Sequence, residues 1–150
     1  MGNSVIKINF FLFFRLPSAF WSGIRLKSID ENICIVTVKH KWFNQNPFNS
    51  MYFAVQSMAA ELSTGALVMS EIRNSDKKIS MLIANNKGNF AKKATGLITF
   101  ECKDGLLIKS AVRRAIETGE PEIIWVKSIG TNEKGEQVSE FDFEWSIKVK

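Results

Sequence analysis

The sequence predicts an α+β fold, in which an antiparallel sheet of about six strands packs against one long buried helix. Two patterns carry this prediction. Residues 50–69 are apolar on every helical face and hold a single charge, Glu61, which is typical of a helix buried on several sides. Residues 141–149 alternate apolar and polar side chains, which is typical of a half-buried strand. The predicted order is helix, two strands, long helix, two strands, short helix, two strands.

The central helix is expected to begin at a polar cap. Asn49 or Ser50 could accept a hydrogen bond from the first free N–H groups, and Pro47 keeps the chain before them extended. The segment approaches the length of a membrane span, but the carboxylate of Glu61 at its centre makes insertion into a bilayer costly. We therefore predict a core helix and no membrane span.

Upstream of the central helix, the pattern predicts a short helix and a hairpin. Residues 1–16 place apolar side chains at helical spacing and end at Pro17, so they are expected to form a lead-in helix. Strands are predicted at 19–26 and 33–41, with a polar turn between them. The second of these strands is apolar on both faces and should lie inside the sheet.

Downstream of the central helix, turn residues divide the chain into five further elements. The expected elements are a strand at 79–84, a break at 85–89, a strand at 90–102 with a bulge at Gly96, a helix at 106–117 that Gly119 stops, and a hairpin of strands at 122–129 and 139–149. No shift in composition marks a boundary, so the chain is expected to form one domain over residues 1–150.

Composition limits the classes of partner. Hydrophobic residues make up 45% of the chain, enough for a substantial core, and the net charge of +5 would suit an anionic partner. The lysines are dispersed, however, and the sequence has no helix-turn-helix, zinc finger or aromatic-basic pattern. A solvated basic surface therefore explains the charge, and no nucleic-acid partner is predicted.

The cysteines and the N-terminal segment bear on the cellular compartment. Cys34 and Cys102 lie in strand-like apolar runs, where buried free thiols in a reducing compartment are expected. Arg15 ends the early apolar run and no cleavage motif follows, so no signal peptide is predicted. Together these features predict a cytoplasmic protein.

The single histidine limits metal and nucleophile chemistry. One His gives little support for a His-rich metal site or a Ser-His-Asp triad, so no metal is predicted. His40 lies among basic and aromatic residues at a strand end, where it is either a boundary residue or a lone base.

Four short motifs, in this order and spacing, resemble the hotdog-fold superfamily. They are Asn46 in a loop, Met58-Ala59-Ala60-Glu61-Leu62 in the central helix, Lys87-Gly88-Asn89 as a basic turn, and the closing hairpin around residues 132–147. The chain looks like the thioesterase-like branch that is related to phenylacetyl-CoA thioesterases and includes poorly characterised bacterial relatives. The resemblance covers about residues 17–150 and implies a curved sheet around one long helix.

The resemblance also implies roles for individual residues. Glu61 would activate water or attack a thioester, and Asn46, or Asn44 as a second candidate, would orient the acyl group or the water. Backbone N–H groups of Tyr52, Phe53 and Ala54 would polarise the thioester carbonyl at the helix start. The implied substrate is an acyl-CoA or acyl-carrier thioester with coenzyme A entering as part of the substrate rather than as a cofactor. The implied assembly is a homodimer or a dimer of dimers, because a second subunit completes the site in this superfamily.

Four further side chains are candidates for binding. The resemblance places Lys87, Lys92 and Lys93 near the phosphates of coenzyme A, although a solvated face is the simpler explanation for exposed lysines. Ser57 could line a pocket beside Glu61, or it could pack in the core.

Two features keep alternatives to catalysis open. Tyr52-Phe53-Ala54 stands where catalytic members commonly carry His-Gly-Gly, so Phe53 would crowd a ligand at the helix start. The carboxylate of Glu61 could also be satisfied by Ser57 and Thr64 on the same helix face. The alternatives are a non-catalytic module that binds an acyl group or an acyl carrier, and a purely structural protein.

Overall fold

The computed structural model describes the backbone of residues 2–150 and the side chains of residues 5–150. The elements in chain order are α1 (Gly2–Arg15), α2 (Pro17–Trp21), β1 (Arg25–Ile29), β2 (Cys34–Lys39), the 3-10 turn η1 (Trp42–Asn44), α3 (Phe53–Asn74), β3 (Ile79–Phe90), β4 (Leu97–Cys102), α4 (Gly105–Thr118), β5 (Glu122–Thr131) and β6 (Gln137–Val149). None of the helices within residues 2–150 is long and apolar enough to cross a bilayer.

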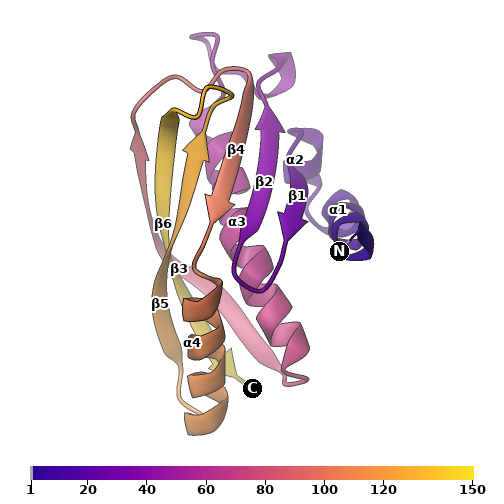
Figure 1. Cartoon of the computed structure of the whole chain (residues 1–150), viewed down its shortest axis with the longest axis vertical. Coiled ribbons are helices and arrows are strands. Elements are labelled where there is room, and N and C mark those ends of the chain that lie inside the picture. Colours follow the sequence, from indigo (N-terminus) through magenta and orange to yellow (C-terminus); the bar gives the residue numbers. More distant parts are fainter. Residues whose placement is uncertain (1) are drawn as a thin grey trace.

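The six strands form one antiparallel sheet in the order β1-β2-β4-β5-β6-β3. The long helix α3 lies against one face of this sheet, while α1 and α2 lie beside β1 at one border (Figure 1). The shorter helix α4 contacts both α3 and β5. The predicted layer arrangement of one sheet around one long helix is confirmed.

The core lies between α3 and the concave face of the sheet. Alternate residues of β5 and β6 point towards the helix, and Val126 and Phe143 face each other in register at its centre. On α3, Ala59, Ala60 and Val68 are fully buried. Full burial of a Val, Leu, Ile, Phe or Met side chain contributes about 1.5–3 kcal/mol to folding. The apolar contact between α3 and the sheet is therefore a major source of stability.

Three buried hydrogen bonds between side chains fix the position of α3 on the sheet. The Ser139 hydroxyl donates to Gln56 Oε1 at 2.8 Å, and the Trp145 indole N–H donates to Thr64 Oγ1 at 3.0 Å. Between them, the hydroxyl oxygens of Ser63 and Ser128 are 2.7 Å apart. A hydrophobic surface alone allows a helix to slide, whereas displacement here would leave buried polar groups without partners.

The two outer strands of the sheet differ in how their edges are treated. At β1, the side-chain amide of Asn9 in α1 donates to the Leu26 carbonyl and accepts from the Leu26 N–H, at 3.0 and 2.9 Å. The other outer strand, β3, is 12 residues long and its outer edge is unpaired within the described chain. A long, unprotected edge strand is a natural site for pairing with another strand.

Most predicted elements are present, but the segment before the first strand is helical. The strand predicted at 19–26 is wrong over its first half, because Pro17–Trp21 is α2 and β1 begins at Arg25. Pro17 occupies the first turn of a helix, where its fixed φ and missing N–H are tolerated. The predicted lead-in helix corresponds to α1, with Met1 outside the described residues.

The chain after α3 also differs from prediction. The predicted break at 85–89 is wrong, because β3 runs on to Phe90 and pairs with β6, so Lys87-Gly88-Asn89 is strand and not turn. The strand predicted at 90–102 begins only at Leu97, and Gly96 has a φ of +70° in the loop before it, where it is not a bulge. Exposed polar residues on an edge strand resemble a turn in sequence, which explains the first error.

The start of α3 is not capped by a side chain. The helix begins at Phe53 with Tyr52 at the N-cap position, and neither Asn49 nor Ser50 caps it as predicted. The helix also continues five residues beyond the predicted end at residue 69, to Asn74.

We predict that Ser63→Ala destabilises the protein by about 1–3 kcal/mol, because it leaves the buried Ser128 hydroxyl without its partner. Ser70→Ala, at a half-buried position on the same helix, is the matched control and should change stability by less than about 0.5 kcal/mol. Urea denaturation measures both. The double variant Ser63→Ala/Ser128→Ala should recover part of the lost stability. If Ser63→Ala and Ser70→Ala destabilise the protein equally, the Ser63–Ser128 hydrogen bond does not contribute to stability.

Candidate functional site

Glu61 lies at the middle of α3, next to a cavity of about 210 Å³. Met58 and Leu62 of the same helix form one wall, and residues 15–19 at the junction of α1 and α2 form the other. The cavity is largely apolar, with the Arg15 and Glu61 side chains as its charged members. An ionisable group that is partly buried beside a small apolar cavity is a common setting for proton-transfer chemistry.

Burial controls the protonation of Glu61. Desolvation disfavours the carboxylate and raises the pKa of Glu61 from 4.5 to about 7. Within residues 5–150, no side chain forms a hydrogen bond or ion pair with this carboxyl group. Thr64 instead donates its hydroxyl to the Glu61 backbone carbonyl and accepts from Trp145, so the interpretation that Ser57 and Thr64 satisfy the acid is wrong.

Gly65 provides the space that the Glu61 carboxyl group occupies. A Cβ at Gly65 would lie 2.9 Å from Glu61 Oε1 and 3.3 Å from the Trp145 ring. A side chain here would displace either the acid or the indole. The sequence analysis did not identify Gly65, although a glycine one turn after a buried acid was an available signal.

A second, larger cavity of about 540 Å³ lies at the start of α3. It contains five of the residues predicted from the sequence to act in binding or catalysis, which are Asn46, Tyr52, Phe53, Lys92 and Lys93. The remaining walls come from the loop before α3 and from Phe90–Ala94. The fold therefore brings together segments that are more than thirty residues apart in sequence.

Asn46 organises the loop that enters α3. Its Oδ1 accepts from the Phe48 N–H at 2.9 Å, and its Nδ2 donates to Ser50 Oγ at 3.0 Å. These local bonds are those of an Asx turn. They fix the amide of Asn46 at the wall of the larger cavity.

The start of α3 presents two free backbone donors. The Tyr52 N–H donates to the Asn44 carbonyl at 2.9 Å and is therefore occupied. Phe53 and Ala54 are the first residues of the helix, and their N–H groups have no acceptor among the described residues. Free N–H groups at a helix N-terminus favour a negatively charged oxygen. The Tyr52 and Phe53 rings flank this position, with centroids 5.0 Å apart.

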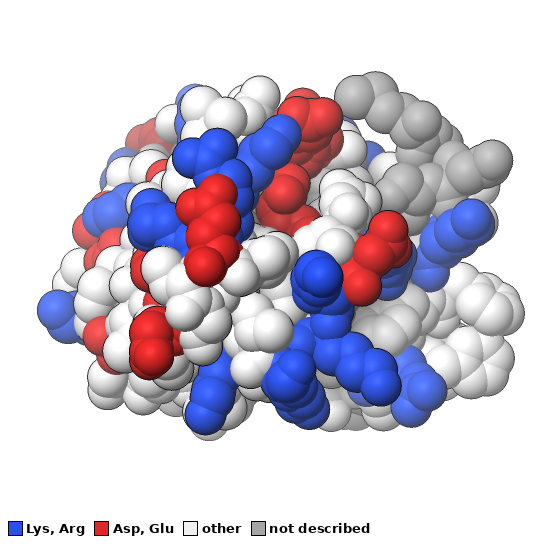
Figure 2. Space-filling view, turned by 90° about the horizontal axis from the view of Figure 1, so that it is seen from below, with Lys and Arg blue, Asp and Glu red and all other residues white. Residues whose placement is uncertain are grey.

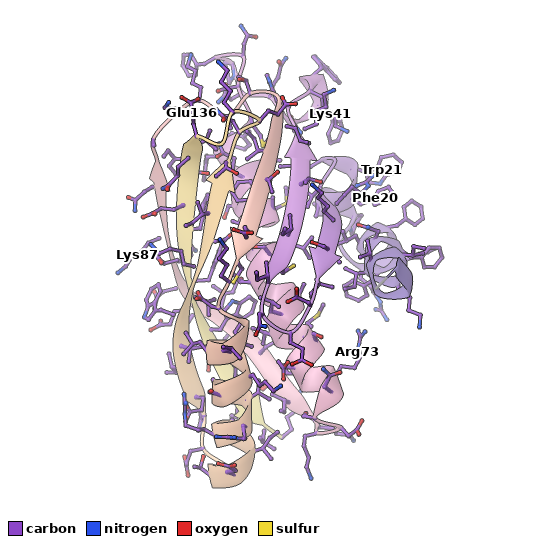
Figure 3. All side chains as sticks on the ribbon, viewed as in Figure 1. Phe20, Trp21, Lys41, Arg73, Lys87 and Glu136 are labelled. Carbon is purple, nitrogen blue, oxygen red and sulfur yellow. The ribbon has the colours of Figure 1, made fainter. Side chains whose placement is uncertain are left out.

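The three predicted lysines do not share one environment. Lys92 forms an ion pair with Glu136 at 2.6 Å, and Lys93 Nζ lies 3.5 Å from the Phe48 carbonyl oxygen, both at the larger cavity. Lys87 projects from β3 with its Nζ 4.8 Å from the Trp125 ring centroid and does not line that cavity (Figure 3).

The two cavities share no lining residue within one chain. Phe53 and Glu61 are eight residues apart on α3, which corresponds to about 12 Å along the helix axis. Between them runs a partly exposed stripe of Ala54, Ser57 and Met58, one face of the helix that the sheet leaves uncovered. Ala54 and Ser57 line neither cavity but lie on the path between them.

Sequence reasoning missed the contribution of the α1–α2 junction. The Glu61 cavity is lined by Arg15, Leu16, Pro17, Ser18 and Ala19, although residues 1–16 were expected only to form a lead-in helix. The contact joins segments forty residues apart, and no local periodicity reports it.

Metal ligands and reactive thiols are not part of either cavity. Among the described residues, no group of three or more His, Cys, Asp or Glu side chains is placed to hold a metal. Cys34 and Cys102 are buried free thiols, as expected from the sequence. They lie opposite each other on β2 and β4, and burial raises the pKa of both.

A six-stranded antiparallel sheet around one long central helix is the arrangement of the hotdog fold. The chain belongs to the family described as a domain of unknown function, DUF4442, whose family model matches residues 9–147. The predicted fold and family resemblance are thereby confirmed. No curated protein sequence matches the chain significantly.

Solved structures share this fold at low sequence identity. A Pseudomonas aeruginosa protein of unknown function, described as a probable thioesterase, is 21% identical with a TM-score of 0.82, over 97% of this chain and 96% of that one. A Chlorobaculum tepidum protein of unknown function is 15% identical with a TM-score of 0.83, over 98% and 95%. A Staphylococcus aureus thioesterase variant is 13% identical with a TM-score of 0.62, over 83% and 93%.

We predict that the stability of the protein depends on pH through Glu61. The folded-state pKa is raised, so the contribution of the neutral acid is complete below about pH 4.5 and is lost as pH rises through about 7. The free energy of unfolding of Glu61→Gln, measured relative to that of wild type, should therefore increase by up to about 3 kcal/mol when the pH is raised from 5 to 8. Urea denaturation at the two pH values measures this difference, with Glu71→Gln as the control for losing one acid from α3. A wild-type to Glu61→Gln difference that stays constant with pH would contradict the raised pKa.

Proposed function

We propose that the protein hydrolyses an acyl thioester, with Glu61 as the general base. The observation that carries this proposal is the Glu61 carboxyl group, which has no side-chain partner within residues 5–150 and lies beside a largely apolar cavity with its pKa raised to about 7. A base with a pKa near the working pH is best suited to take a proton from water and return it. The likeness to hotdog proteins described as thioesterases supports the same reaction class.

The proposed reaction proceeds through a tetrahedral intermediate. Glu61 takes a proton from water as the water oxygen attacks the thioester carbonyl carbon, and negative charge forms on the carbonyl oxygen. The free N–H groups of Phe53 and Ala54 would stabilise that oxyanion, and Asn46 would orient the water or the acyl group. The carbon–sulfur bond then breaks, and the thiolate receives the proton that Glu61 held. Direct attack by the carboxylate is the second route. The Glu61 carboxylate would displace the thiolate by breaking the carbon–sulfur bond, and water would then hydrolyse the acyl-enzyme anhydride to the free acid and Glu61.

A second copy of the chain is needed to assemble these groups. Within one chain, Glu61 and the helix-start donors line different cavities. Pairing two copies along the open edge of β3 would extend the sheet across both copies. We propose that this pairing brings the start of α3 in one copy close to Glu61 on α3 of the other copy. The proposed assembly is therefore a homodimer in which each site uses residues of both copies, and two such dimers could associate.

The thiol carrier is proposed to be coenzyme A. Lys92 and Lys93 lie at the rim of the larger cavity, where they could meet phosphate groups, although Lys92 would first leave Glu136. Lys87 is a weaker candidate, since it lies on β3 away from this cavity. No separate cofactor is required, and the free buried thiols of Cys34 and Cys102 fit a reducing, cytoplasmic compartment.

Binding without turnover is the second candidate function. Phe53 places an aromatic ring at the helix start, where catalytic relatives were expected to carry glycine. The ring is 55% exposed and lies 6.3 Å from Phe90 between centroids, so it narrows the approach to the free N–H groups. A module that holds an acyl group or acyl carrier would tolerate this restriction.

We expect the purified protein to hydrolyse at least one member of an acyl-CoA panel, and Glu61→Gln to lower kcat/KM by a factor of about 10²–10⁴. The activity should rise with pH through about 7, because the ionised acid is the base. Release of free thiol measures the reaction, and Glu71→Gln on the same helix is the control that should retain activity. Saturable binding of acyl-CoA without thiol release would support the binding module, and equal rates for wild type and Glu61→Gln would refute the role of Glu61.

We expect Leu82→Lys to weaken the homodimer by about tenfold or more. Leu82 is 67% exposed on β3, and a charged side chain on an edge strand disfavours pairing of that edge with another strand. Light scattering over a dilution series measures the dissociation constant. Leu106→Lys removes an equally exposed leucine (66%) from α4 and should leave assembly unchanged. A monomeric wild type at all concentrations would exclude the shared site.

A further inference from the structure

The outward face of α1 and α2 carries a continuous group of exposed apolar side chains. Ile6, Phe10, Phe13 and Phe14 are spaced so that they form one stripe along α1, and Trp21 of α2 extends it. We call these five residues the aromatic face. Phe10 is 66% exposed and Trp21 is 59% exposed, and ring contacts connect Phe10 to Phe14, Phe14 to Phe13, and Phe13 to Trp21.

The orientation of this face is fixed by the opposite side of α1. Leu12 is fully buried, and Asn9 forms two hydrogen bonds with Leu26 at the edge of the sheet. The helix is thus anchored by its polar and buried side, so the aromatic face points away from the core. Trp21 and the neighbouring Phe20 lie on the side of the molecule that carries α1 (Figure 3).

The segment that carries the aromatic face has basic but no acidic side chains of its own, and the nearest acid that lines a cavity with it is Glu61. Residues 1–29 contain Lys7, Arg15, Arg25 and Lys27 and no acidic residue, although the whole chain has 15 acids. Lys7 and Arg15 are exposed on α1, and neither forms an ion pair within the described chain. At the end of the molecule seen from below, by contrast, acidic side chains lie among the basic ones (Figure 2).

We propose that the aromatic face binds the surface of an anionic lipid bilayer. Aromatic side chains on a helix that lies flat, bordered by Lys and Arg, are the features of an interfacial membrane contact. A second copy of the chain is a poorer occupant, because two-fold pairing of this face would bring its uncompensated positive charges together. A bilayer with acidic headgroups satisfies both the apolar and the charged groups.

This contact would place the Glu61 cavity close to the membrane. Residues 15–19 line that cavity and also join the two helices of the aromatic face. The inference itself rests on α1 and α2 and does not require that the protein be a thioesterase.

The test is sedimentation of the full-length protein with phosphatidylcholine vesicles that either contain or lack phosphatidylglycerol. Wild type should bind the phosphatidylglycerol vesicles and bind less as salt is raised. Phe10→Ser/Phe14→Ser should reduce binding by about tenfold or more, because two exposed rings no longer enter the interface. Leu106→Ser, which removes an exposed leucine from α4, is the control that should bind like wild type.

A second variant protects the test against misfolding of the first. Lys7→Glu changes an exposed residue and should weaken binding to phosphatidylglycerol vesicles. Wild type that stays unbound, or both variants binding as wild type does, would overturn the proposal. Light scattering without vesicles addresses the other occupants: a smaller assembly for Phe10→Ser/Phe14→Ser than for wild type would assign the face to a protein contact and would also overturn it.

Discussion

Enclosure of α3 is the constraint on which the rest of the structure depends. A helix with apolar side chains on all faces cannot remain at a surface, so the sheet must curve around it. Apolar burial supplies most of the energy, but it does not fix the position of the helix along the sheet. The pairs Gln56–Ser139, Ser63–Ser128 and Thr64–Trp145 fix that position, because each would lose a buried partner if α3 moved by one turn.

The enclosure is incomplete along one stripe of α3, and the proposed chemistry lies there. The sheet covers the other faces of α3 but not this one. The residues on the uncovered face are partly exposed: Ala54, Ser57, Met58 and Glu61. A carboxyl group at such a gap is buried enough to raise its pKa but remains accessible from a cavity. Gly65 contributes directly, since a side chain there would fill the space of the acid. The same incomplete layer thus sets both the protonation of Glu61 and its access to substrate.

The sequence predicted the fold well because periodicity reports burial. In residues 141–149 and in α3, the spacing of apolar residues indicates both the type of element and the face that is buried. Exposed segments have no such spacing, so their structure was predicted less well. Phe20 and Trp21 resembled a strand although they belong to a helix at the surface, and the polar half of β3 resembled a turn because it lies at the sheet edge. Glu61 and Asn46 were found as candidates, but their separation into two cavities depends on packing between distant segments. Arg15 at the Glu61 cavity was missed for the same reason.

The proposed dimer and the proposed membrane contact would use opposite edges of the sheet. Asn9 occupies the backbone groups of Leu26, so α1 protects the β1 edge from further strand pairing. The β3 edge, at the opposite end of the strand order, has no such cover within the described chain. Assembly through β3 would therefore complete the proposed sites while leaving α1 and α2 at the outer ends of the combined sheet. The aromatic face of each copy would stay uncovered, and the residues that join α1 to α2 would hold the Glu61 cavity beside it.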